Sequence, residues 1–188
     1  MRRLVFATAL LMCATTAAAQ LTEGPAFEIR PYVGVSVPTG DQRDLFEDAA
    51  LLGAQFAVQV KRDFHLVGSF GWIPGESKYA VRNQNVSILQ YDVGAEVALV
   101  RPMGRWEWKP FLGAGGGART YLYHGRLLDD KTCFAGYGSL GMEFQLGRTA
   151  ARMEARDNVF CFKSPIDGVA SKTRNEIGLS LGVAFHFQ

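Results

Sequence analysis

The last segment of the chain, EIGLSLGVAFHF at residues 176–187, alternates apolar side chains with polar or small ones almost without a break. The apolar set consists of Ile177, Leu179, Leu181, Val183, Phe185 and Phe187. Alternation with a period of two places one set on each face of a β-strand. The segment therefore predicts a strand with one apolar and one polar face.

The same alternation recurs throughout the chain, and no segment shows the apolar stripe of an amphipathic helix. An all-β fold follows. The predicted strands number eight and lie near residues 27–37, 51–61, 65–73, 87–100, 109–123, 134–147, 151–160 and 174–187.

The connections between these strands alternate in length. Short connections fall at residues 62–63, 101–108 and 147–150. The other connections are longer and more polar, and they fall at residues 38–50, 74–86, 124–133 and 161–173. Tight turns at one end and long loops at the other are typical of outer-membrane barrels. We therefore expect an eight-stranded antiparallel up-and-down transmembrane β-barrel.

The first twenty residues, MRRLVFATALLMCATTAAAQ, contain a charged start, a short apolar stretch and an alanine-rich cleavage sequence. They predict a signal peptide at residues 1–19, which leaves residues 20–188 as one barrel domain. A lipoprotein leader acylated at Cys13 is the less favoured alternative. Such leaders carry a small residue just before the cysteine, whereas this chain has the bulky Met12.

Composition excludes two broad classes. With 188 residues and 48% apolar side chains, the chain is long enough for one domain and too apolar to be disordered. Its 20 basic residues stand against 18 acidic ones. That balance lacks the excess positive charge of a nucleic-acid-binding protein, so no nucleic-acid partner is expected.

Alternation alone does not decide which face is outside. A soluble, lipocalin-like barrel turns its apolar face inward, whereas a membrane barrel turns it toward lipid. The polar set contains six acids and five bases at strand positions, which can neutralise one another in a narrow lumen. We also expect His186 to face the lumen near Glu28 once the barrel closes. The predicted lumen ionic network is Glu28, Arg30, Lys61, Asp92, Glu96, Arg119, Glu143, Arg152, Glu154, Arg156, Glu176 and His186.

Aromatic residues favour the membrane orientation, because they gather near the strand ends where the two bilayer interfaces attract them. The alternative is that aromatic side chains simply suit strands. The predicted turn-side belt is Phe64, Trp106, Trp108, Phe111, Phe185 and Phe187. The predicted loop-side belt is Trp72, Tyr121, Tyr123, Phe134, Phe160 and Phe162.

The chain resembles the small OmpA/OmpX-type outer-membrane β-barrel family. The resemblance lies in the segments WKPFLGAGGGARTYLY, RMEARDNVF and NEIGLSLGVAFHF. It implies a place in the outer membrane of a Gram-negative cell and a terminal aromatic residue, here Phe187, read by the barrel-assembly machinery. Two features depart from the pattern. Gln188 follows Phe187, and Pro31 has no backbone N–H to donate to a neighbouring strand. A bulge, or a strand starting at Pro31, would accommodate the proline.

The charged lumen of the expected barrel also predicts a function. We expect a monomeric structural anchor that presents its four long loops, contacts outer-membrane lipid and lipopolysaccharide, and has a lumen plugged by charged side chains. The charged residues of loops 38–50 and 74–86 are candidates for binding surfaces or lipopolysaccharide. The alternative is a narrow channel for small or apolar solutes, as in OmpW-like barrels.

Enzymatic activity is not expected. Lipid A-modifying barrels are the relevant precedent, and the deacylases among them carry a histidine two places before a serine. His65, His124 and His186 are followed at that spacing by valine, arginine and glutamine. The spacing of the histidines also suggests no metal site. The glycine run at 113–117 lacks the helix that a phosphate-binding loop needs, so no cofactor is predicted.

Two further predictions concern strand seven and its neighbours. Cys133 and Cys161 flank the turn at 147–150 almost symmetrically, which suggests a disulfide in an oxidising compartment. Arg152, Glu154 and Arg156 share one face, and we expect a structural pillar paired with Glu143 and Glu176. A ligand-coordinating ladder is the alternative.

Overall fold

The computed structural model confirms a closed antiparallel barrel of eight long strands, with one additional short strand. It describes residues 26–40, 43, 47–77, 84–103, 106–123, 130–162 and 172–187, and the predicted leader at 1–19 lies outside these ranges. The strands are β1 (Phe27–Thr39), β2 (Ala49–Lys61), β3 (Phe64–Ser77), β4 (Gln84–Ala98), β5 (Arg101–Met103), β6 (Trp106–Tyr123), β7 (Lys131–Leu146), β8 (Thr149–Phe162) and β9 (Lys172–Phe187).

No helix among the described residues is long and apolar enough to cross a membrane.

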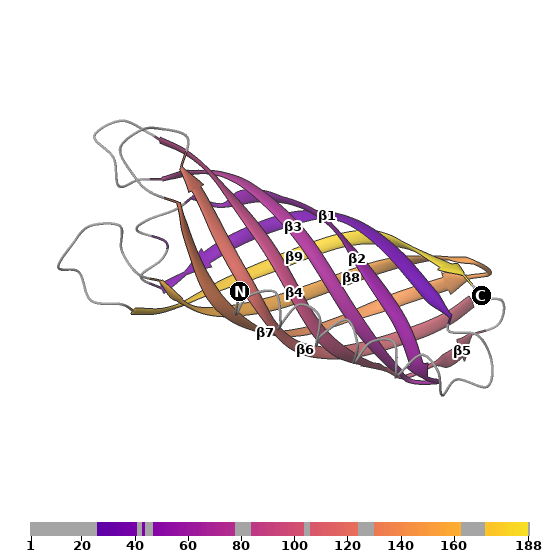
Figure 1. The fold of residues 1–188 in the computed structure, drawn as a ribbon. Coiled ribbons are helices and arrows are strands. Elements are labelled where there is room, and N and C mark those ends of the chain that lie inside the picture. Colours follow the sequence, from indigo (N-terminus) through magenta and orange to yellow (C-terminus); the bar gives the residue numbers. More distant parts are fainter. Residues whose placement is uncertain are drawn as a thin grey trace.

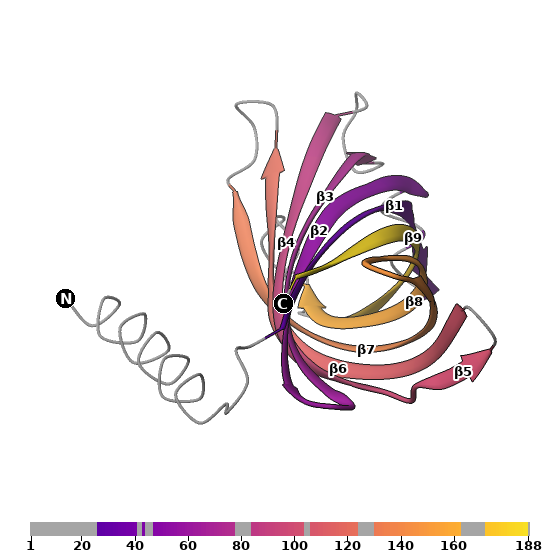
Figure 2. The ribbon, with the colours of Figure 1, turned by 90° about the vertical axis from the view of Figure 1, so that its right-hand side faces the viewer.

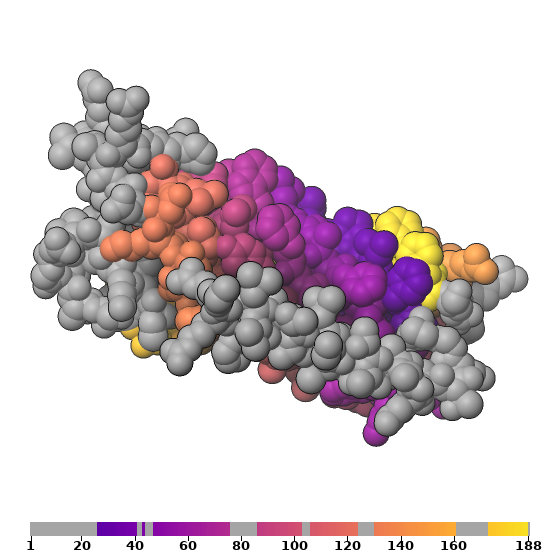
Figure 3. Space-filling view, viewed as in Figure 1, coloured from indigo at the N-terminus to yellow at the C-terminus, as the bar shows by residue number. Residues whose placement is uncertain are grey.

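Two pairings close the sheet into a barrel. The last strand, β9, pairs with the first, β1, from Phe187–Phe27 to Asn175–Thr39, and β4 pairs with β6. Figures 1 and 2 show the strongly tilted strands that this closure requires. At the seam, the rings of Phe27 and Phe187 stack with their centroids 5.0 Å apart. The first and last segments accordingly lie side by side in the space-filling view (Figure 3).

The long and short connections lie at opposite ends of the barrel, as the sequence predicts (Figure 1). The strands extend several residues into the predicted loops; for example, β3 reaches Ser77 and β4 begins at Gln84. The short strand β5 was not predicted. It pairs with Trp106–Trp108 of β6 and lengthens the hairpin at the turn end.

Pro31 corrects one expectation. The strand β1 starts four residues before it, and the β1–β9 register is the same on both sides, from Ile29–Phe185 to Tyr32–Gly182. Neither a bulge nor a strand start is present. The ladder instead omits the pairs at Arg30 and Pro31, because proline offers no N–H to β9.

The apolar face is the outer one on every long strand. Valine, leucine, isoleucine and phenylalanine side chains are exposed there, whereas most charged strand residues are buried inside. Examples from the outer face are Val33, Phe56, Leu66, Val93, Leu112, Leu140, Met153 and Leu181.

The aromatic belts are only partly as predicted. Trp72, Phe134, Trp106, Trp108, Phe185 and Phe187 are exposed on the outer wall. Phe64 is half-buried, and the side chain of Phe162 lies outside the described residues. The prediction is wrong for four residues that are buried inside the lumen, namely Phe111, Tyr121, Tyr123 and Phe160. These four residues lie on the same face of their strands as the neighbouring charged residues, which point into the lumen. The alternation therefore decides their position, and not the preference of aromatic rings for the bilayer interface.

The glycine run at 113–117 forms part of β6 and has a packing role. A Cβ atom at Gly115 would lie 2.6 Å from the Cα of Gly94 and 2.7 Å from Cε1 of Tyr137. The bare backbone therefore lets the Tyr137 ring approach the barrel wall closely.

Candidate functional site

The turn-end half of the lumen contains a continuous network of ion pairs. Arg152 contacts three carboxylates from three strands: Glu96 on β4, Glu143 on β7 at 3.5 Å, and Glu154 on β8 at 3.3 Å. Its guanidinium carbon also lies 3.5 Å from the centre of the Phe111 ring. Arg152 is therefore the hub that links opposite walls of this half.

Two other arginines extend the network along the barrel axis. Arg156 contacts Glu154 at 2.8 Å and Asp92 at 3.1 Å. Arg30 donates to Glu28 through Nε at 2.7 Å and lies 3.3 Å from Glu96. All of these side chains are at least nine-tenths buried, so the charges are tolerable only because they are paired.

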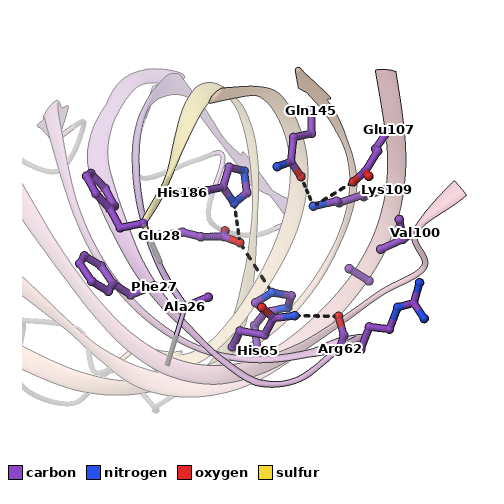
Figure 4. A pocket seen from close by; sticks show the side chains of 13 residues that line it. Ala26, Phe27, Glu28, Arg62, His65, Val100, Glu107, Lys109, Gln145 and His186 are labelled. Atoms are coloured by element: carbon purple, nitrogen blue, oxygen red, sulfur yellow. Dashed lines mark hydrogen bonds and ion pairs between the residues drawn. The ribbon is translucent and has the colours of Figure 1, made fainter. Parts of the chain in front are cut away.

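The network ends at a pocket that opens at the turn end of the barrel. The pocket has a volume of about 330 Å³, and Figure 4 shows its lining side chains. His186 and His65 both lie beside Glu28, with Nδ1 of His186 3.0 Å and Nε2 of His65 3.6 Å from the same oxygen, Oε1. On the opposite wall, Lys109 donates to Gln145 and lies 3.8 Å from the carboxylate of Glu107.

The loop-end half of the lumen is different, because an apolar cluster fills much of it, together with the buried charged residues Arg119, Arg174 and Glu176. Its cluster contains Leu51, Ile73, Val86, Ile88, Tyr121, Tyr123, Ala135 and Phe160. Arg119 is fully buried here at 0% exposure, with its guanidinium carbon 5.9 Å from the Phe160 ring centre. Among the described residues, none of the three Arg119 side-chain nitrogens has a hydrogen-bond partner.

Eleven of the twelve predicted network residues lie in the lumen, but not all in one network. Arg119 is buried in the apolar half. Glu176 is also buried in the barrel and accepts a hydrogen bond through its backbone carbonyl from Asn158. The remaining eight acidic and basic residues of the turn half, together with His186, form contiguous contacts. They are Glu28, Arg30, Asp92, Glu96, Glu143, Arg152, Glu154 and Arg156.

Two details of the prediction are wrong. Lys61 is exposed at the end of β2, because the β2–β3 register shifts between Gln59 and Lys61 and takes it out of the inward phase. The expected pillar has Glu143 as a partner of Arg152, as predicted, but the second predicted partner, Glu176, is wrong. Among the described residues, Arg152 and Arg156 pair with Asp92, Glu96, Glu143 and Glu154 rather than with Glu176.

Sequence reasoning missed three contributors to this half. His65 follows the two-residue turn after β2, and Gln55 donates to Glu154 at 2.8 Å. Lys109 lies 3.8 Å from Glu143. Each of the three lies on the inward-facing side of its strand. Applying the alternation to uncharged residues and to residues at strand ends would have identified them.

The predicted disulfide stays a prediction. Cys133 is half-buried on β7, and the described β7–β8 ladder ends at the pair Ala135–Phe160, before either cysteine. The side chain of Cys161 lies outside the described residues.

His65 and His186 contact carboxylates, and the buried hydroxyl of Ser69 accepts from Arg156 at 3.1 Å. Within the described part of the chain, no serine hydroxyl has a histidine as hydrogen-bond partner, which is the contact that activates a nucleophile. His124 lies outside the described residues.

Comparison with solved structures agrees with the fold. The chain is similar to Neisserial surface protein A, with a TM-score of 0.65 and 14% identity over 88% of this chain and 100% of that one. It is also similar to the N-terminal β-barrel domain of Pseudomonas aeruginosa OprF, with a TM-score of 0.57 and 15% identity over 86% and 97%. Outer Membrane Protein W of E. coli gives a TM-score of 0.54 and 15% identity over 89% and 100%.

No family model and no curated protein matches the sequence. The chain has the fold of the small eight-stranded outer-membrane barrels.

Proposed function

We propose that this protein is an integral, monomeric barrel of the outer membrane that anchors and presents surface loops. In this proposal it is not an enzyme, and its lumen is closed to solutes. The proposal combines the fold with the distribution of apolar and charged side chains on the two faces of the barrel wall.

The outer wall carries the proposal. Large apolar side chains are exposed on every long strand, including Leu112 at 67% and Leu181 at 60%. A soluble monomer rarely exposes an apolar patch larger than a few hundred square ångströms. A wall that is apolar all the way round is stable only against lipid, which matches the outward apolar band of transmembrane barrels.

Side chains from every wall support a closed lumen. The arginine–carboxylate network fills the turn half, and the aromatic and aliphatic cluster fills the loop half. An eight-stranded barrel is just wide enough for its interior to be filled in this way. In this proposal no continuous water path crosses the lumen, and the barrel serves as a rigid support for the loops.

The loops then become the functional surface. Four long connections leave the same end of the barrel, between β1 and β2, β3 and β4, β6 and β7, and β8 and β9. Half of the charged residues expected in the first two loops, namely Asp41, Asp44, Lys78 and Arg82, lie outside the described residues. Lipopolysaccharide and outer-membrane lipid are the proposed neighbours of this end. The barrel-assembly machinery is proposed to recognise the C-terminal strand β9.

Fractionation and gel mobility test the proposal directly. We expect the mature chain in the outer-membrane fraction, and we expect it to migrate faster unheated than boiled, because folded barrels resist detergent. A mature chain that stays folded and monomeric in buffer without detergent would reverse the orientation of the two faces and reject the proposal.

A narrow channel for small or apolar solutes is the second candidate. The apolar inner face of the loop half favours it, because such a lining offers a path to solutes that a charged lining rejects. Planar-bilayer recordings separate the two functions for ions, and uptake of a small apolar dye into protein-containing vesicles separates them for apolar solutes. A closed anchor gives no steady current and no added uptake.

A further inference from the structure

Three side chains at the inner end of the turn-end pocket, two of which line it, bring together ligand atoms that the sequence does not place near one another. Glu28 on β1, Glu143 on β7 and His186 on β9 each offer one ligand atom, and these atoms all lie within 4.8 Å of one another. The spacing of the histidines along the chain predicted no metal site. The three groups meet only because closing the barrel brings β1 and β9 together and because β7 faces them across the lumen.

Both carboxylates are held in the same way. In Glu28, Oε2 is bound by Arg30, whose Nε donates at 2.7 Å, and Oε1 lies 3.0 Å from Nδ1 of His186. In Glu143, Oε2 lies 3.5 Å from Arg152, and Oε1 lies 3.5 Å from Nε2 of His186. Each carboxylate is thus anchored by an arginine through one oxygen and presents the other oxygen to the imidazole.

The separations of these atoms suit a small cation. Two ligands that each lie about 2.0–2.2 Å from a tetrahedral zinc ion are about 3.3–3.6 Å apart. Nδ1 of His186 lies 3.0 Å from Oε1 of Glu28, close to this separation. Oε1 of Glu143 faces the other imidazole nitrogen, Nε2, at 3.5 Å, and the three ligand atoms lie within 4.8 Å of one another. One ion binds one imidazole nitrogen, so a rotation of His186 or Glu143 completes the set.

The charge balance of the buried network is compatible with a bound cation. Five buried carboxylates are in contact with four basic side chains, which leaves one negative charge before the histidines are considered. The carboxylates are Glu28, Asp92, Glu96, Glu143 and Glu154, and the basic groups are Arg30, Lys109, Arg152 and Arg156. A cation at the pocket would neutralise this excess.

The ion has a way in and room for water ligands. Glu28 and His186 line the open pocket of about 330 Å³, so solvent can complete the coordination shell. His65 lies 3.6 Å from Glu28 on the side of the pocket and supports the position of that carboxylate.

We propose that the turn end of the lumen binds one divalent transition-metal ion of the zinc class through Glu28, Glu143 and His186. Imidazole and carboxylate together select this class over magnesium and calcium, which prefer oxygen ligands alone. The ion ties the first strand, the last strand and β7 together, so binding locks the seam at which the barrel closes.

Binding is measured on the folded mature barrel in detergent micelles, without a histidine tag. Titration with Co²⁺ followed by its visible absorption, and with Zn²⁺ by calorimetry, is expected to give one equivalent per chain. His186→Gln and Glu143→Gln are expected to weaken binding more than about tenfold. Mg²⁺ at the same concentration should not compete. Unheated gel mobility verifies that each variant is folded.

Two controls test the location. Glu107→Gln changes an exposed carboxylate of the same pocket, and His124→Gln changes the remaining histidine. Both are expected to bind within about twofold of the parent, since neither contributes to the proposed ligand set. Loss of binding in His124→Gln would put the ion elsewhere and overturn the proposal.

A measurement on the unaltered chain covers the case in which the His186 variant fails to fold. Zn²⁺ is expected to protect His186, and not His124, from acylation by diethyl pyrocarbonate, as mapped by mass spectrometry. No stoichiometric binding, or equal labelling of His186 with and without Zn²⁺, would mean that His186 acts only as a hydrogen-bonded cation between the two carboxylates. The failure of this site leaves the proposed membrane anchor intact, because fractionation tests the anchor independently.

Discussion

The two halves of the lumen solve the same packing problem with different chemistry. In the turn half, Arg152 and Arg156 each contact at least two carboxylates, so the buried charges are compensated. In the loop half, aromatic and aliphatic side chains fill the space, and Arg119 lies among them with no hydrogen-bond partner among the described residues. Arginine therefore links the walls of the lumen in the turn half. In the loop half, the buried charge of Arg119 costs folding free energy.

This difference shows what makes a buried charge stabilising. Removing one partner from a buried ion pair is costly because the other charge stays behind, whereas replacing an unpaired charge with an apolar side chain can be neutral or favourable. The same substitution, arginine to methionine, should thus have opposite consequences at Arg152 and Arg119.

The largest effect is expected from Arg152→Met. The substitution leaves Glu96, Glu143 and Glu154 without their shared cation, and breaking such a buried pair costs about 3–5 kcal/mol. Urea unfolding in lipid vesicles, followed by tryptophan fluorescence, measures the loss of unfolding free energy. Lys61→Met is the matched control because Lys61 is exposed, and it should unfold like the parent. An Arg152→Met barrel as stable as the parent would show that the network contributes little.

The next effect tests the outer wall that both halves share. Leu181 lies in the middle of β9, opposite Val33 and Met153, and is 60% exposed. If lipid surrounds it, Leu181→Arg should lower the unfolding free energy in vesicles by about 2–4 kcal/mol, the cost of a basic residue near the bilayer midplane. The same urea titration measures it, with Leu181→Ile as the control. A stable Leu181→Arg barrel would mean that water surrounds this face.

How far the sequence predicts the molecule also differs between the halves. In the turn half, charged residues alternate with apolar ones, so the phase of Asp92 and Glu96 on β4 reveals which face is inside. At the loop end of β4 the alternation is reversed: Val86 and Ile88 point inward, whereas Ser87 between them is half-exposed. Reading the polar set as the inner face there gives the wrong answer.

The missed residues have local physical reasons. Tyr121 and Phe160 were assigned to a belt because they are aromatic, yet both continue the inward phase set by Arg119 and Arg156. The cluster of Glu28, Glu143 and His186 depends on contacts between distant strands, which only the closed barrel reveals.

A moderate effect is expected from Ile73→Ala in the loop half. Ile73 is 1% exposed within the apolar cluster, and truncating a buried aliphatic side chain costs about 2–5 kcal/mol. We expect about 2–3 kcal/mol, because the cluster lies near the strand ends, where neighbours can partly close the cavity. Ile73→Val should cost less than half as much. If Ile73→Ala has no effect on the urea midpoint, this half is not packed as a core.

The smallest effect, and the sharpest test of the comparison, is expected from Arg119→Met. Methionine has a similar length and fills the space beside Phe160 without a charge. Because the guanidinium nitrogens have no hydrogen-bond partner among the described residues, the unfolding free energy should stay within about 1 kcal/mol of the parent or rise. Arg119→Lys, which keeps a charge without the flat guanidinium, should be less stable than Arg119→Met. A loss in Arg119→Met as large as that in Arg152→Met would mean that the loop half compensates its buried charge as strongly as the turn half does, and the contrast between the two halves would then be wrong.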